Sequence, residues 1–123
     1  MIIPEVVRIG SCDYEVILTD KVTLKESHQC YGHIDWEHHV IEIDKTLQDV
    51  QGLEHTFLHE LVHGIVYERS LDLENSDEET IADELARGLH QVIRDNPEMF
   101  LDDSYFEEDT ENEEEIDVQT DKQ

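Results

Sequence analysis

The sequence predicts an α+β fold, in which a small antiparallel or mixed sheet of about three to four strands packs on two main helices. Short runs of β-branched and aromatic residues, separated by turn residues, occupy residues 1–45. Apolar residues then recur at helical spacing between residues 53 and 95. Residues 102–123 hold eleven acidic residues and one Lys. They contain too few apolar side chains for burial to offset the conformational entropy lost on ordering. We therefore expect one domain over residues 1–101, followed by a disordered acidic tail over residues 102–123.

The first two strands are expected on either side of a Gly-Ser pair. Residues 6–9 are rich in β-branched side chains, and residues 14–18 resume with Tyr, Val, Ile and Leu after Gly10-Ser11. This pattern is typical of a β-hairpin or a bulged strand. The polar residues 19–28 that follow select no particular secondary structure.

A second strand pair is expected over residues 29–34 and 40–43, with a turn at residues 35–39. Gly32 interrupts the first of these strands and indicates a bulge, because it has no side chain to pack. We expect the strand at residues 40–43 to offer an exposed edge along which an extended peptide can add.

The spacing of apolar residues predicts an amphipathic helix over residues 53–69. Its main stripe recurs at i, i+3, i+4 and i+7, and consists of Leu58, Leu61, Val62 and Ile65. The residues that widen this stripe are Leu53, Phe57 and Val66. Gly52 is the expected break with the preceding loop.

A second helix is expected after the polar linker at residues 70–77. Ser76 and Glu79 have the spacing of a capping box, which marks a helix N-terminus. The apolar face of this helix comprises Ile81, Leu85, Leu89 and Val92, flanked by Ala82, Ala86 and Ile93. The helix is expected to end at Asn96-Pro97.

The first helix carries the sequence His59-Glu60-Leu61-Val62-His63, an HExxH motif. Two histidines four residues apart in a helix lie on one face, about 6 Å apart along the axis, and both can bind one metal ion. A glutamate between them can act as general base toward a zinc-activated water. A His- and Glu-rich chain can contain this motif by chance, so its helical context matters more than its letters.

A catalytic zinc usually has three protein ligands, and the second helix is the expected source of the third. Glu79 is our candidate, with Asp83 one turn later to accept the free N–H of a liganding imidazole. The side of the helix that would face the motif comprises Glu79, Ala82, Asp83, Ala86 and His90, with Glu84 rotated away. Glu78 is the alternative third ligand. Alternatively, Glu79 serves only as the acidic residue of the capping box and binds no metal.

With these pieces, the chain resembles the gluzincin metallopeptidases, and within them the small ImmA/IrrE-like proteins of bacteriophages and mobile elements. The resemblance covers roughly residues 29–93. It rests on three segments, namely Val40-Ile41-Glu42-Ile43, the stretch Thr56 to Gly64 that contains the motif, and Glu79-Thr80-Ile81-Ala82-Asp83-Glu84-Leu85-Ala86.

The resemblance implies a minimal zincin-like core, with His59, His63 and Glu79 as Zn²⁺ ligands and Glu60 as general base and acid. Asp83 matches the aspartate that orients a ligand in thermolysin-like sites. The chain departs from longer members, since it begins with strands instead of an N-terminal helix and shows no helix-turn-helix domain. Its second helix also lacks the Leu-Met-Pro ending, so the identity of the relatives' substrates does not transfer to this chain.

The charge of the chain bears on its partners. The formal net charge is -25, and the excess of acids persists without the tail. Such a surface repels nucleic-acid phosphates and attracts basic proteins, although solubility alone also explains an acidic surface. The resemblance adds repressor-like regulators as a substrate class, so a basic, DNA-binding protein is the expected substrate.

We expect a cytoplasmic protein, in a bacterium or a phage-infected host. No apolar run reaches the length of a membrane span, and no secretory signal pattern begins the chain. Cys12 and Cys30 are expected to be free thiols in a reducing compartment, with a weak case for metal binding because they lack CxxC spacing. The sequence leaves the oligomeric state open.

Several further residues are candidates for the site. Tyr67, one turn past His63, is a candidate transition-state stabiliser, as are Tyr31 and His33. His55 is an alternative metal ligand. His90 is a candidate for a hydrogen bond that orients a metal ligand. The histidines near the expected strand turn are His28, His33, His38 and His39, for which solvated loop positions are the simpler interpretation.

The expected function is that of a zinc-dependent metalloendopeptidase cleaving a protein or peptide substrate. The alternatives are a non-catalytic, zinc-stabilised acidic binding module and an inhibitor of a DNA-binding protein.

Overall fold

The computed structural model describes residues 1–20 and 31–101. Within them the elements are β1 (Val6–Ile9), β2 (Cys12–Thr19), β3 (Gly32–Asp35), β4 (Val40–Asp44), α1 (Val50–Glu68), α2 (Glu78–Asp95) and a 3₁₀ helix, η1 (Pro97–Phe100). The predicted α+β class with a mixed sheet and two main helices is confirmed. The expected disordered tail, and most of the connection at 19–28, lie outside the described residues.

The four described strands form one sheet in the order β1-β2-β4-β3. Both predicted hairpins are present as antiparallel pairs, β1 with β2 and β3 with β4. The hairpins are joined by parallel pairing of β2 with β4, in a register that sets Glu15 opposite Val40 and Thr19 opposite Asp44. Consequently β4 is an interior strand, and β3 forms one edge of the sheet. The expectation that residues 40–43 form an exposed edge was wrong, because both sides of β4 are paired.

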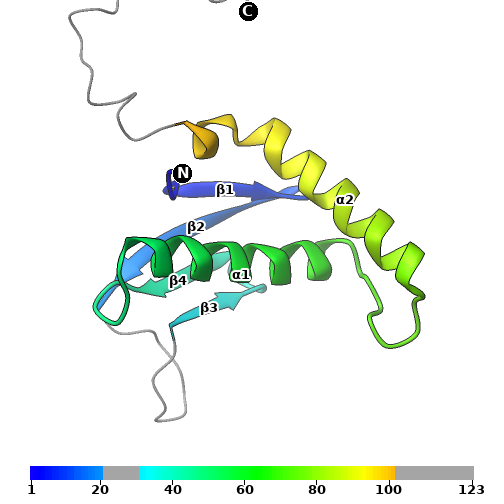
Figure 1. Cartoon of the computed structure of the whole chain (residues 1–123), viewed down its shortest axis with the longest axis horizontal. Helices are drawn as coiled ribbons and strands as arrows, with labels where there is room; N and C mark the ends of the chain where they lie inside the picture. The colour runs from blue at the N-terminus through cyan, green and yellow to red at the C-terminus, as the bar shows by residue number, and fades with distance from the viewer. Residues whose placement is uncertain (21–30, 102–123) are drawn as a thin grey trace, which may run out of the picture.

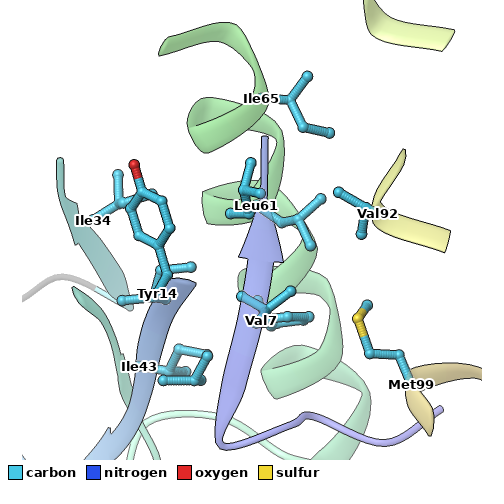
Figure 2. Close-up of a cluster of buried hydrophobic side chains, with 12 residues drawn as sticks. Val7, Tyr14, Ile34, Ile43, Leu61, Ile65, Val92 and Met99 are labelled. Atoms are coloured by element: carbon cyan, nitrogen blue, oxygen red, sulfur yellow. The ribbon is translucent and has the colours of Figure 1, made fainter. Parts of the chain in front are cut away.

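Both helices cover the sheet. In Figure 1, α1 lies over the sheet roughly along the direction of β1, and α2 extends toward the β1 side, where η1 follows it. Alternate residues of β1 are buried and exposed, so one face of that strand packs and the other is solvated. Figure 2 shows the core between the sheet and the helices. The sheet contributes Val7, Tyr14 and Ile43, and α1 contributes Leu61 and Ile65. Val92 of α2 and Met99 of η1 complete this cluster.

Helix α1 begins earlier than predicted. Asp49 is its N-cap, and its carboxylate accepts a hydrogen bond from Gly52 N at 2.8 Å. Gly52 therefore lies inside the first turn and does not break the chain. The buried face is also rotated from the predicted stripe, since Leu58 and Val62 are each 40% exposed. The buried residues are Thr56, Phe57, Glu60, Leu61, Gly64 and Ile65.

Helix α2 is capped by Asp77, whose carboxylate accepts from Thr80 N at 2.9 Å. The predicted capping box at Ser76 was wrong by one residue. The helix ends at Asn96, as predicted, and that side chain ties it to β1. Asn96 is 3% exposed, accepts from Arg8 N at 2.9 Å and donates to Arg8 O at 3.0 Å. This reciprocal pair satisfies backbone groups of Arg8 on strand β1.

Candidate metal and catalytic site

The two histidines of the motif lie side by side on the outer face of α1. The ring centroids of His59 and His63 are 4.8 Å apart, with planes inclined at 79°. Both side chains are exposed. This follows from their spacing, because residues four apart in a helix are neighbours on one face. Two imidazoles in this position can supply two nitrogen ligands to one ion from solvent.

Glu60 lies on the inward side of the same turn, about 100° around the helix from His59. The residue is only 7% exposed, and among the described residues its carboxylate has no hydrogen bond or ion pair. Burial raises the pKa of this carboxyl, against the lowering effect of His59, His63 and His33. A buried carboxylate without hydrogen-bond partners is rare in proteins, and such groups are concentrated at functional sites.

Glu60 packs against the edge strand β3. A Cβ built on Gly32 would lie 3.2 Å from Glu60 Oε2 and 2.6 Å from Thr56 Cγ2. The absence of a side chain at Gly32 is therefore what admits the carboxylate against the strand. The sequence marked Gly32 only as a bulge, whereas β3 pairs with β4 in regular register from Gly32 to Asp35. The structure thus places Glu60 against the edge strand of the described sheet.

The residues predicted on the second helix occupy its solvent side. Glu79, Ala82, Asp83, Ala86 and His90 are all exposed, so they share one side as expected but not the packed one. The Asp83 carboxylate accepts from Arg87 Nε at 3.0 Å within the helix. The structure does not bring Glu79 or Asp83 to the motif histidines, and their assignment stays a prediction.

The packed side of α2 is the one that carries Glu84 and Gly88. Glu84 accepts from Arg69 Nε at 2.7 Å, although the sequence indicated that it was rotated away. Gly88 makes the closest approach, since a Cβ there would lie 2.3 Å from Ile65 Cγ2. A glycine on the packed side therefore allows the close approach of the helices, whereas Ala82 and Ala86 lie on the exposed side.

The other candidates surround the motif at the surface. Tyr67 is 49% exposed and stacks on Trp36 of the β3–β4 turn, with centroids 4.9 Å apart and planes inclined at 7°. Tyr31 is 59% exposed. His33 on β3 is half-buried and close enough to Glu60 to affect its pKa. His55 and His90 are exposed. Of the loop histidines, His28 lies outside the described residues, and exposed His38 contacts Asp35 Oδ2 at 2.9 Å.

One cluster escaped the sequence analysis. Within residues 1–20 and 31–101, a single group of three side chains has metal-ligating atoms that all lie within 4.8 Å of one another, namely Cys12, His39 and Glu68. No spacing rule connects these positions, because they are far apart in the chain and meet only through the fold. The sequence indicates Cys12 and His39 only as weak candidates for metal binding, and no pattern in it marks Glu68.

No helix in the described part of the chain has the length and apolar character needed to cross a membrane. Comparison of the chain with family models, with curated proteins and with solved structures found no match in any of the three.

Proposed function

We propose that the protein is a zinc-dependent metallopeptidase, with Glu60 as general base. The observation that carries this proposal is the environment of Glu60. It is a buried carboxylate without hydrogen-bond partners among the described residues, and it lies between the exposed histidines of α1 and β3, the edge strand of the described sheet. Structural carboxylates are normally solvated or paired, so this combination favours a chemical role.

The donor groups of the motif suit zinc. His59 and His63 offer two imidazole nitrogens from one face of α1, and zinc readily binds nitrogen ligands. Glu79 is proposed as the third ligand on the resemblance to gluzincins alone. Its side of α2 is exposed, so ligation by Glu79 requires α2 to change its orientation relative to α1.

When bound, zinc acts as a Lewis acid that acidifies water and polarises a scissile carbonyl. Glu60 takes a proton from the attacking water and delivers it to the leaving amine. Its raised pKa suits both steps, because a carboxyl whose pKa lies closer to neutral is a stronger base and still a usable acid. His33 is close enough to Glu60 to lower the pKa of its carboxyl, and can stabilise the carboxylate in this way.

The outer edge of β3, which no other described strand pairs, is proposed to bind the substrate backbone. An extended peptide can pair with an unpaired strand edge through main-chain hydrogen bonds. Because Gly32 of this strand is in contact with Glu60, a peptide on the edge passes close to the general base. The substrate is proposed to be a protein with a basic surface, such as a DNA-binding regulator, since the chain carries a formal net charge of -25.

The decisive experiment compares metal content and cleavage in three proteins. Wild type is expected to retain zinc through purification and to cleave a member of a panel of basic, DNA-binding proteins. Glu60→Gln is expected to retain zinc and lose cleavage by at least about 100-fold. A His59→Ala, His63→Ala variant is expected to lose zinc from this site together with cleavage.

Other outcomes assign the chain to other classes. Zinc retained at His59 and His63 without cleavage of any panel member would instead indicate a metal-stabilised binding module. Equal metal content in wild type and the double histidine variant, with no cleavage by either, would contradict a zinc site at His59 and His63. The remaining hypothesis would then be an acidic inhibitor of a DNA-binding protein. The chain would be identified as such if it prevented a panel member from binding DNA.

A further inference from the structure

We infer that Cys12, His39 and Glu68 form a second metal site, separate from the HExxH motif and suited to Zn²⁺ or a similar thiophilic divalent ion. Their ligating atoms all lie within 4.8 Å of one another, and all three side chains are half-buried. The inference does not depend on the proposed function.

The sheet topology brings the three residues together. Cys12 is the first residue of β2, and His39 immediately precedes β4. Because β2 and β4 run parallel, these beginnings lie at the same end of the sheet. Glu68 is the last residue of α1, whose C-terminal end reaches the same place. Three chain segments thus contribute one ligand each, an arrangement that only the folded state provides.

Glu68 is held in position by neighbours. Its Oε2 accepts a hydrogen bond from the hydroxyl of Tyr14 at 2.7 Å. Tyr14 is fully buried, and burial followed by the bond to Glu68 raises its pKa, so the phenol remains a neutral donor. A Cβ on Gly10 would lie 3.1 Å from Glu68 Cβ, so the glutamate stem packs over that turn. A hydrogen bond of this kind orients a carboxylate ligand toward a metal.

His39 is held in an uncommon backbone conformation. Its φ is 59°, in the left-handed region that few residues other than glycine adopt. Its carbonyl accepts from Glu15 N at 2.9 Å, and its ring packs edge-on against Tyr14 with centroids 5.1 Å apart. These contacts direct the imidazole toward Cys12 and Glu68. Such backbone strain is frequently found where a side chain has a functional position to keep.

The donor set identifies the class of ion. A thiolate, an imidazole and a carboxylate are all zinc ligands, and together they disfavour Ca²⁺ and Mg²⁺, which prefer oxygen. Bond lengths of about 2.0–2.3 Å in a tetrahedral site separate ligand atoms by roughly 3.3–3.8 Å. From the present limit of 4.8 Å, closure requires movements of about 1 Å, within reach of side-chain rotation. A fourth position would remain for water or another ligand.

This cluster and the motif face different ways on α1. Glu68 follows His63 by five residues, which corresponds to a rotation of about 140° around the helix. A metal at one site is therefore not shared with the other, and their ligand chemistry also differs. Only the Cys12 site contains sulfur, and this difference makes the two sites separable by spectroscopy.

The test is titration of the full-length, reduced, metal-free protein with Co²⁺ while the absorption spectrum is recorded. A cysteine-ligated Co²⁺ gives a thiolate-to-cobalt charge-transfer band in the near ultraviolet, which a site of histidines and carboxylates does not give. Wild type is expected to show this band with one Co²⁺ bound at Cys12, His39 and Glu68, and to bind a second Co²⁺ when the histidine motif is also a metal site. The His59→Ala, His63→Ala variant is expected to keep the band and bind one. This result would hold even if the proposed peptidase function failed.

The ligand variants are chosen to preserve the fold. Cys12→Ser is expected to abolish the band, whereas Cys30→Ser retains it. His39→Asn keeps a residue that tolerates positive φ, and Glu68→Gln keeps an acceptor for Tyr14. Both variants are expected to weaken Co²⁺ binding at least about 10-fold, as is Tyr14→Phe, which removes the hydrogen bond to the carboxylate. Absence of the band in wild type, its survival in Cys12→Ser, or its loss in Cys30→Ser would overturn the assignment. Circular dichroism of each metal-free variant separates loss of a ligand from loss of the fold.

Discussion

The carboxylate of Glu60 lies directly against the backbone of Gly32, with 3.2 Å between Oε2 and the position that a Cβ on Gly32 would take. The catalytic candidate of the helix and β3, the edge strand of the described sheet, are thereby in contact. A side chain at this one strand position would separate them.

Gly32→Ala is expected to lower the free energy of unfolding by about 1–3 kcal/mol, because the new methyl group overpacks the contact between β3 and α1. The methyl would lie 2.6 Å from Thr56 Cγ2. Thr56→Ser removes that methyl and keeps the hydroxyl that donates to Gln48. The double variant Gly32→Ala, Thr56→Ser is therefore expected to recover much of the loss in urea denaturation. Full stability of the single variant would show that β3 does not pack closely on α1.

Glu60→Gln is expected to stabilise the metal-free protein by on the order of 1 kcal/mol at neutral pH, because it removes a buried charge. Burial raises the pKa of Glu60 above its ordinary value of 4.5, so the folded protein binds this proton more tightly than the unfolded chain. The contribution of this group is fully present below pH 4.5 and is lost as the pH rises through the folded pKa. Denaturation with a chelator present, between pH 4 and 8, measures this loss.

Glu60→Gln should lack that pH-dependent loss. Glu84→Gln is the matched control, because Glu84 is partly exposed and paired with Arg69. Its removal should cost at most about 1 kcal/mol. Equal pH profiles for wild type and Glu60→Gln would contradict the burial of a charged Glu60.

The orientation of α2 is tested by two substitutions on opposite sides of the helix. Gly88→Ala is expected to destabilise by about 1–3 kcal/mol through overpacking against Ile65, despite the better helix propensity of alanine. Ala86→Leu, on the exposed side, is expected to change stability by less than about 0.5 kcal/mol. Thermal unfolding decides between the two sides. The reverse result would mean that the side carrying Glu79 packs on α1, as a zinc ligand there requires.

Tyr67→Phe separates the hydroxyl of Tyr67 from its ring. Trp36 is the only tryptophan of the chain, and its ring stacks on Tyr67, so its fluorescence reports the stack. Tyr67→Phe is expected to leave the emission unchanged and to lower kcat by at least about 10-fold, as loss of a transition-state hydrogen bond does. Tyr67→Ala should also shift the emission to longer wavelength. An unchanged kcat in Tyr67→Phe would assign Tyr67 to packing alone.

Local patterns predicted the elements well because each depends on neighbouring residues. The hairpin about Gly10-Ser11, the turn before Val40 and the end of α2 at Asn96 are all present. The capping box at Ser76 and the break at Gly52 were wrong. Asp77, one position after Ser76, and Asp49, three positions before Gly52, accept hydrogen bonds from the helix N–H groups instead.

The sequence by itself determined the α+β class and that His59 and His63 share a helix face, because hairpins and i, i+4 neighbours follow from local geometry. Only the tertiary structure decided that this face is exposed, that β3 is the edge of the described sheet, that α2 packs through Gly88, and that Cys12, His39 and Glu68 meet. Strand order and helix rotation are selected by packing between segments far apart in the chain. Apolar residues lay on more than one side of each helix, so periodicity alone could not choose the buried one.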